Sequence, residues 1–245
     1  MIKNHLVKET VYISLLMQLI TTLISLDGLN YDLLKRDKIL HDILILEALV
    51  QFVEAGFYIW VILALKDLKM MTPRRYIDWF LTTPTMLVST VIFMEYLKRK
   101  ETGGPSFTLR EFLVENKKDV ILIASLNFLM LLFGYLGETG VLNNSSAVAI
   151  GSVFFVGSFK YIYDNYAYHT SYGKTLFYVI AFVWALYAVA ACLPVIAKNT
   201  MYNILDIFSK NFYGVFIYYY IRQVGVRKFP NGSGTENGLY KLMVS

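Results

Sequence analysis

The sequence predicts an all-α membrane protein, a seven-transmembrane helix bundle, from its hydropathy, its charge pattern and the length of its apolar runs. Of the 245 residues, 56% are hydrophobic and only 17% are charged, and the mean hydropathy is +0.49. The charged residues cluster between long apolar runs, which is typical of polytopic membrane proteins rather than soluble domains. Each of seven runs has roughly the 20 residues that cross a bilayer as a helix.

Each apolar run is expected to form one membrane helix. The expected helices are about Val7–Leu26, Asp42–Leu65, Arg74–Leu97, Asp119–Gly137, Ser146–Tyr166, Thr175–Ala197 and Met201–Arg222. The longest loop joins the third and fourth helices, and its segment TLREFLVENKKD predicts a short surface helix. Residues 1–230 are expected to form one domain, and the Gly/Ser/Asn-rich residues 231–245 a flexible tail.

The basic residues orient the bundle. Most of the 23 Lys and Arg residues flank the runs on the side of the first–second, third–fourth and fifth–sixth loops and of the C-terminus. The positive-inside rule makes that side cytoplasmic and the N-terminus extracellular. Because these residues stand at helix ends, the net charge of +5 does not indicate binding to nucleic acid.

Histidine and cysteine give no indication of a metal site or of a disulfide. The three histidines, His5, His41 and His169, are far apart in the sequence, so no metal site is expected. Cys192 is the single cysteine and cannot form an internal disulfide. No feature indicates an enzyme.

Polar residues recur at helical spacing in the first two helices. The first helix carries Ser14, Gln18, Thr21 or Thr22, and Ser25, and the second carries Glu47, Gln51, Glu54 and Tyr58. Each set forms one stripe on its helix. Two intramembrane glutamates on one face predict a water-filled cation path. The alternatives are hydrogen bonding between helices and a contact between protomers.

The third helix begins with RRYIDWFLTTPTML and carries an intramembrane charge. Asp78 stands a little inside the extracellular end, and Arg75, three residues earlier, shares its face. An interfacial salt bridge is the alternative to a functional pair. Pro84 is expected to kink the helix, with Thr82 and Thr83 satisfying the freed backbone groups.

The seventh helix holds a lysine near its middle, Lys210, with Asp206 one turn before it. An ammonium group in hydrocarbon costs about 3 kcal/mol or more, so such lysines are usually functional. The alternatives are a lysine that snorkels to the interface and a structural Lys–Asp pair. A desolvated lysine also condenses readily with an aldehyde to give a Schiff base. With Asp78 and Arg75, the interior would hold two positive and two negative charges, which balance.

RYIDWFLTTPTML on the third helix, together with LDIFSK on the seventh, resembles the microbial rhodopsins, and the likeness covers essentially the whole chain. The resemblance implies that Lys210 carries all-trans retinal as a Schiff base, with Asp78 and Asp206 as counterions. It implies that Asp78 is the first proton acceptor and is hydrogen-bonded to Thr82. It assigns further retinal contacts to Trp79, Thr83, Met86, Trp184, Tyr187 and Arg75. The sixth helix departs from the family pattern, with Ala188 where a proline is frequent and Ala191 where a second tryptophan is frequent.

Residue 89 bears on the choice between a pump and a channel. Proton pumps of this family usually carry a carboxylic acid eleven residues after the acceptor, and counting from Asp78 gives Ser89. A serine is a poor proton donor. Lys198 stands where pumps often place a proton-releasing glutamate. Asn127 on the fourth helix is expected to face Thr83, which resembles a gate of the channelrhodopsins.

The chain most resembles the rhodopsins of giant viruses that infect algae, in particular their channel-forming group. We therefore expect a light-gated cation channel, with a weak outward proton pump as the alternative and a sensory photoreceptor as a third class. The expected ion path is lined by Ser14, Gln18, Glu47, Gln51, Glu54, Ser89 and Asn127. The expected partners are retinal, the lipid bilayer and monovalent cations or protons, and assembly into a homo-oligomer is left open. A multi-pass protein of viral origin would lie in the host-cell membrane.

Overall fold

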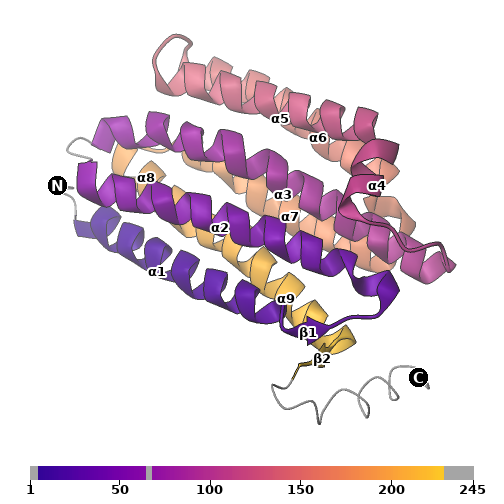
Figure 1. The fold of residues 1–245 in the computed structure, drawn as a ribbon. Helices are drawn as coiled ribbons and strands as arrows, with labels where there is room; N and C mark the ends of the chain where they lie inside the picture. Colours follow the sequence, from indigo (N-terminus) through magenta and orange to yellow (C-terminus); the bar gives the residue numbers. More distant parts are fainter. Residues whose placement is uncertain (1–4, 65–67, 229–245) are drawn as a thin grey trace.

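Long helices run side by side as nearly parallel rods in the computed structural model, which describes residues 5–64 and 68–228 (Figure 1). The helices are α1 (His5–Gly28), α2 (Ile39–Ala64), α3 (Met71–Thr102), α4 (Leu109–Glu115), α5 (Lys117–Glu138), α6 (Asn144–Asn165), α7 (Ser171–Ala191), α8 (Val195–Asp206) and α9 (Phe212–Val224). Short elements are β1 (Tyr31–Asp32), β2 (Val226–Arg227), the 3₁₀ turns η1 (Lys35–Asp37), η2 (Leu68–Met70) and η3 (Ala167–His169), and the π-helical turn η4 (Ile207–Asn211).

Within the described residues, seven long helical rods make up the bundle. Six helices are individually long and apolar enough to span a membrane. The seventh crossing consists of α8, η4 and α9, which follow one another without a break. We call this composite helix the seventh rod. The predicted seven-helix bundle is confirmed.

The boundary between the sixth and seventh crossings differs from the prediction. The sixth helix was expected to continue to about Ala197, but α7 ends at Ala191, and α8 begins at Val195 rather than near Met201. Pro194 explains the difference, because proline lacks an N–H and disfavours helical backbone at the residue before it. The expected helix end at Leu65 and the tail 231–245 lie outside the described residues.

The predicted surface helix between the third and fourth crossings is confirmed as α4. Its N-terminus forms a capping box: the Glu111 backbone N–H donates to the Thr108 hydroxyl, and the Glu111 carboxylate accepts from the Thr108 N–H at 2.7 Å.

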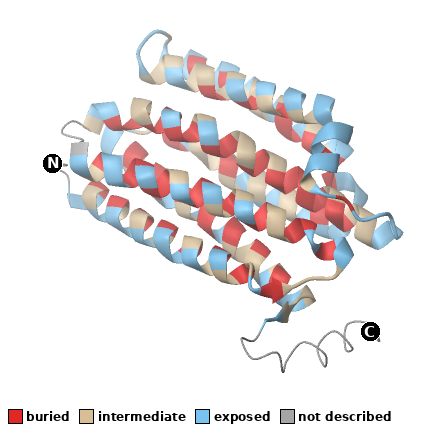
Figure 2. Cartoon of the chain, in the orientation of Figure 1, coloured by how far each residue is buried: buried red, intermediate tan, exposed pale blue. Residues whose placement is uncertain are grey.

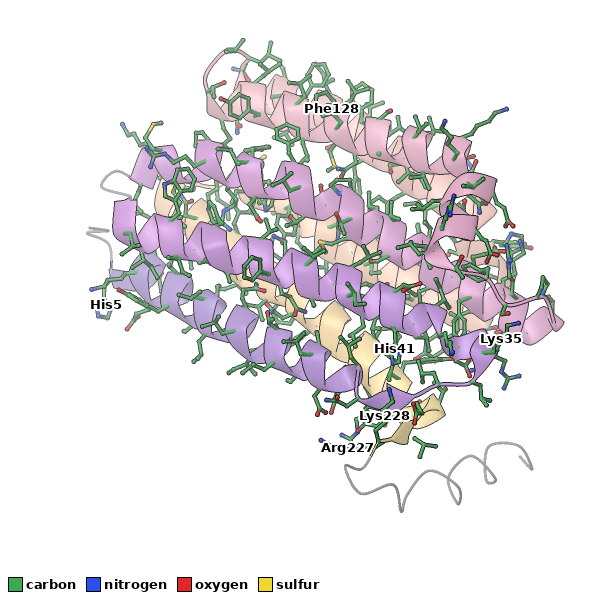
Figure 3. The ribbon with its side chains drawn as sticks, in the orientation of Figure 1. His5, Lys35, His41, Phe128, Arg227 and Lys228 are labelled. Atoms are coloured by element: carbon green, nitrogen blue, oxygen red, sulfur yellow. The ribbon has the colours of Figure 1, made fainter. Side chains whose placement is uncertain are left out.

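The two short strands also pair: β1 is antiparallel to β2 and ties the first loop to the chain that follows α9. Figure 3 places Lys35, Arg227 and Lys228 at this end of the bundle, in keeping with the predicted charge asymmetry.

Buried residues gather on the helix faces turned toward the interior of the bundle, and exposed residues on the outer faces (Figure 2). Many of the exposed residues are large and apolar, as suits contact with lipid. Phe128 on α5 is one of these outward residues and is 51% exposed. Of the six helices that span individually, α3 has the largest buried share. Arg75 and Asp78 therefore lie on the most buried of these six helices.

Candidate functional site

Lys210 lies in η4, the π-helical turn in the middle of the seventh rod. A π-helix bonds residue i to i+5, so that its turn holds more residues than an α-helical turn. Ser209, Lys210 and Asn211 are consecutive, yet all three are buried. Successive side chains of an α-helix point about 100° apart, and the wider turn brings these three closer to one direction. The π turn thus presents a cluster of polar groups to the interior.

Three carboxyl groups from three helices surround the Lys210 ammonium. Its Nζ lies 2.9 Å from Asp78 Oδ2, 3.1 Å from Glu54 Oε1 and 3.7 Å from Asp206 Oδ1. All four side chains are at most 3% exposed. The predicted proximity of Lys210 to Asp78 and Asp206 is confirmed. Glu54, expected in the ion path, is a third carboxyl at the same amine.

Arg75 pairs with Asp206 rather than with Asp78. Its guanidinium forms an ion pair with Asp206 and also donates to the side-chain oxygen of Asn203 and to Tyr58. Arg75 and Asp78 do share a helix, but the Arg75 side chain extends toward the seventh rod. Asp206 accepts further hydrogen bonds from Tyr58 at 2.9 Å and Tyr187 at 2.8 Å. The two aspartates therefore differ, because Asp206 is satisfied by several donors.

The expected hydrogen bond between the Thr82 hydroxyl and the Asp78 carboxylate is absent. Thr82 Oγ1 donates instead to the backbone carbonyl of Asp78 at 3.0 Å, and Thr83 Oγ1 donates to that of Trp79 at 2.8 Å. Such bonds to the residue four positions earlier compete with other partners in a helix. The carbonyl that Pro84 leaves without its helical N–H partner is that of Phe80, so neither threonine hydroxyl binds the freed group, contrary to the prediction. Asp78 Oδ1 has no hydrogen-bond partner among the described residues.

An apolar cavity extends from Lys210 toward α5, α6 and α7. Trp79, Thr83, Met86, Trp184 and Tyr187, all predicted as retinal contacts, line it together with Lys210. The Trp79 and Tyr187 rings meet edge to face, with centroids 5.4 Å apart. Arg75, also predicted as a retinal contact, does not line this cavity. Its guanidinium contacts Asp206, Asn203 and Tyr58 instead.

The cavity has the chemistry that a polyene aldehyde needs. Its walls are aromatic and aliphatic, and a single amine stands at its end beside carboxyl groups, so the residues present fit retinal. Ala188 and Ala191, the two departures of the sixth helix from the family pattern, line the cavity. Their small side chains leave space where larger residues are frequent in the family.

The polar stripes of α1 and α2 face each other and the seventh rod inside the bundle. Gln18 bridges two elements: its amide donates to Glu54 on α2 and to Asn211 Oδ1 on the seventh rod at 2.9 Å. The Ser14 hydroxyl donates to the Asn203 carbonyl at 2.9 Å. These five residues are fully buried. The stripes therefore form a continuous polar core beside Lys210.

The polar core extends toward the predicted cytoplasmic side. The Ser25 hydroxyl donates to Gln51 Oε1 at 3.3 Å, and the Ser89 hydroxyl donates to Glu47 Oε1. Asn127 on α5 donates to Thr83 Oγ1 at 2.8 Å, which confirms the expected contact. That contact stands at the retinal-facing side of α3, away from the α1–α2 stripes. The roles of these residues in ion conduction remain predictions.

Three asparagines of the seventh rod complete the site and were not predicted. Asn199, Asn203 and Asn211 are fully buried. Asn203 binds Arg75, and Asn211 binds Gln18. The sequence does hold a signal for Asn199 and Asn203, because they recur at helical spacing with Asp206 and Lys210 on one face.

Comparisons with known proteins agree with this geometry. The sequence profile of a family described as bacteriorhodopsin-like protein matches residues 9–224. The green-light absorbing proteorhodopsin of a gamma-proteobacterium is 27% identical over 170 residues, and the match spans 60% of this chain and 60% of that protein.

Among solved structures, viral rhodopsin OLPVRII has 26% identity and a TM-score of 0.76, covering 89% of this chain and 99% of that one. Exiguobacterium sibiricum rhodopsin shares the fold, with 19% identity, a TM-score of 0.67, and coverage of 89% of this chain and 97% of that one. The predicted resemblance to microbial and viral rhodopsins is confirmed. A matching family profile over most of the chain, the seven rods and the buried lysine at the end of an apolar cavity lead to one conclusion: the chain belongs to the bacteriorhodopsin-like family of microbial rhodopsins.

Proposed function

We propose that this rhodopsin is a light-gated cation channel whose path runs between α1, α2, α3 and the seventh rod. Retinal bound to a lysine is the chromophore of the family, and we assign that lysine to Lys210. When bound there, retinal supplies the absorption of light and the isomerisation that moves the Lys210 nitrogen. Every later step depends on groups of the chain itself.

Asp78 is the proposed acceptor of the Lys210 proton. Its Oδ2 is 2.9 Å from Lys210 Nζ, the shortest of the three carboxyl distances, which is within reach for direct proton transfer. Asp206 lies farther away and already accepts from Arg75, Tyr58 and Tyr187. Those donors stabilise its negative charge and make it a poorer acceptor.

The observation that carries the proposal is the contact between Glu54 and Lys210. Glu54 Oε1 lies 3.1 Å from the amine, and Glu54 Oε2 accepts from Gln18 on α1. A loss of positive charge at Lys210 therefore acts directly on a carboxyl of the polar core. Two unit charges at this separation interact by several kcal/mol, about 5 at an effective dielectric constant of 20. Weakening that attraction frees Glu54 on α2 to move away from Lys210 on the seventh rod, which would open the path.

The burial of the polar core inside a single chain favours an ion path over a contact between protomers. Gln18, Glu47, Gln51 and Glu54 are each 0% exposed in the single chain. Side chains that served an interface with another copy would lie on the outer surface. Hydrogen bonding between helices remains the competing interpretation, and it predicts a polar core that never conducts.

Voltage-clamped photocurrents of cells that express the protein test the proposal. A passive channel gives currents that change sign near the cation equilibrium potential. We expect Glu54→Gln to reduce the photocurrent severalfold and to change its ion selectivity, because the substitution removes the carboxyl that couples Lys210 to the polar core. Glu101→Gln is the matched control, since Glu101 is an exposed residue at the end of α3.

An unchanged current and selectivity in Glu54→Gln would contradict the role of the polar core. A current that keeps one direction at all voltages would instead support the second candidate, a light-driven outward proton pump. Proton transfer from Lys210 to Asp78 is the first step in both cases. The pump therefore stays a candidate on the Asp78 geometry, and the sign of the current separates the two functions.

A further inference from the structure

We propose that a basic pocket at the predicted cytoplasmic end of α3 binds a dianionic phosphate group. This chemistry is shared by a phosphomonoester lipid headgroup and by free phosphate. The pocket is separate from the Lys210 cavity, and the proposal holds for a channel and for a pump alike. It assigns a ligand to a group of cations that the proposed function leaves unused.

Three segments of the chain converge to form the pocket. Arg36 comes from η1 in the first loop. Arg99 and Lys100 belong to the end of α3, and residues 103–107 form the loop that leads to α4. Gly103 follows α3 in the left-handed conformation, with a φ of +70°, which glycine adopts without steric cost. The loop can therefore turn sharply at the end of α3, beside Arg99. Figure 3 shows Lys35, the neighbour of Arg36, at this end of the bundle.

The wall of the pocket presents three cationic side chains, Arg36, Arg99 and Lys100, and its described lining residues include no carboxyl group. A cleft lined by one sign of charge focuses the electrostatic potential and concentrates counterions. Arginine guanidinium groups also match the oxygens of a phosphate with two parallel N–H donors. Basic pockets between membrane helices on the cytoplasmic side are known to bind phosphorylated lipid headgroups. The wall therefore favours an anion, and its two guanidinium groups favour a phosphate.

Lys100 and Arg36 keep free donors although a carboxyl group stands beside them. The buried Asp37 lies outside the wall, 3.2 Å from Lys100 Nζ, which also donates to the Tyr96 hydroxyl at 2.7 Å. An ammonium group has three N–H donors, so one is left. Arg36 Nε is 3.7 Å from Asp37 Oδ2, which is beyond hydrogen-bond distance, and the Arg36 side chain is 61% exposed. Asp37 thus holds Lys100 in place, and Arg36 is available to a ligand.

Arg99 adds a guanidinium group in a fixed orientation. Its Nε donates to Glu95 at 2.7 Å and its Nη2 to Glu115 at 3.0 Å, so Nη1 has no hydrogen-bond partner among the described residues. The guanidinium stacks on Phe107, 4.4 Å from the ring centroid. Glu115 is 55% exposed, and an exposed ion pair is worth only about 0–1 kcal/mol, so a phosphate can replace Glu115 at low cost. Ser106, in the same wall, contributes a hydroxyl.

Thermal melting of the full-length, retinal-loaded protein in phosphatidylcholine nanodiscs tests the site, because a ligand of the folded state raises Tm. The soluble probe is inorganic phosphate, compared with chloride at matched ionic strength. The lipid probe is phosphatidic acid, a phosphomonoester, compared with phosphatidylglycerol, a phosphodiester. We expect phosphatidic acid to raise Tm more than phosphatidylglycerol does.

Substitution of Arg36 locates the response. We expect Arg36→Gln to raise the half-saturating content of phosphatidic acid about tenfold or more, because it removes a charge-assisted hydrogen bond to the phosphate. Arg110→Gln is the matched control. Arg110 is exposed on α4 at the same end of the bundle and does not line the pocket, so its substitution removes the same charge and should leave the response unchanged.

The outcomes separate the two sources of phosphate. A response to phosphatidic acid alone that depends on Arg36 assigns the pocket to a lipid headgroup, whereas an Arg36-dependent response to inorganic phosphate as well shows that the free anion suffices. No response to either probe, an equal response to phosphatidylglycerol, or an equal loss in Arg36→Gln and Arg110→Gln would overturn the proposal.

A second variant keeps the test decisive if Arg36→Gln does not fold. Ser106→Glu places a carboxylate in the wall of the pocket from an exposed loop residue, and it should abolish the response by repelling the phosphate. A full response in Ser106→Glu would overturn the proposal equally. Photocurrents play no part in these measurements, so a failure of the proposed channel function would leave the phosphate site intact.

Discussion

Replacing Arg75 with glutamine tests how the buried charges are balanced. Arg75 is 0% exposed, and its guanidinium pairs with Asp206 and also binds Asn203. Removing one member of a buried pair leaves the other charge uncompensated and costs about 3–5 kcal/mol. For a chain of this size, 1 kcal/mol shifts Tm by about 2–4 °C. We therefore expect Arg75→Gln to lower Tm by roughly 6–20 °C.

The double variant Arg75→Gln/Asp206→Asn separates the loss of charge balance from the loss of packing. Asparagine at position 206 still offers an acceptor to Tyr58 and Tyr187, and Lys210 retains two carboxyl partners. Replacing both members of a buried pair is often nearly neutral. The double variant should therefore recover at least about half of the lost free energy of unfolding.

Thermal melts followed by circular dichroism, with the retinal-loaded protein also followed by its visible absorbance, measure these shifts. Arg74→Gln is the matched control, because Arg74 is the adjacent arginine and stacks on Trp60 at 5.0 Å. That contact is worth about 0.5–1 kcal/mol at an exposed site. A double variant no more stable than Arg75→Gln would refute the charge-balance reasoning.

Three further predictions concern the lysine, the cavity and the surface. Lys210→Ala should bind no chromophore covalently and should stay colourless with retinal supplied, and a variant that kept the visible band would end the assignment of Lys210. Gly134→Ala should destabilise the protein by about 1–3 kcal/mol, because its Cβ would lie 2.5 Å from the Tyr76 hydroxyl, whereas Gly56→Ala, with no atom within 4 Å, should not. Hydrogen bonds from the Thr108 backbone and hydroxyl lower the pKa of Glu111 from its ordinary 4.5. The stabilisation that the Glu111 carboxylate gives α4 is therefore complete above that value and is lost as the pH falls through the lowered pKa. The protection of the α4 amides from exchange, relative to their intrinsic rates, should therefore fall only at the lower pH.

The structural features that depend on the periodicity of a single helix could be predicted from the sequence. Each apolar run specified one crossing, and the polar stripes of α1 and α2 follow from residues three and four positions apart. The inward position of Lys210 and its proximity to Asp78 and Asp206 follow from the cost of an unpaired charge in hydrocarbon. The Asn127–Thr83 contact was expected only through a family resemblance, and the structure confirms it.

What depends on the relative height and rotation of two helices could not be predicted. Sequence spacing puts Arg75 and Asp78 on one face, but it does not say that the long Arg75 side chain reaches Asp206 across the bundle. The contacts of Glu54 with Lys210 and of Ser89 with Glu47 have the same origin, because α2 packs against its neighbours at a height set by many side chains. The π turn at η4 also has no simple signature in the sequence, yet it decides which residues of the seventh rod face inward.

The position of Lys210 divides the bundle into two halves of opposite chemistry. On one side, the apolar cavity is lined by α3, α5, α6, α7 and part of the seventh rod, and its polar side chains are the lysine, several hydroxyls and two indoles. On the other, α1, α2 and the seventh rod enclose the polar core that contains Glu54 and Gln18. An event in the first half reaches the second only through groups that touch both. Lys210 lines the cavity and lies 3.1 Å from Glu54, so under the proposed function a change of charge on its nitrogen would couple light absorption to the polar core.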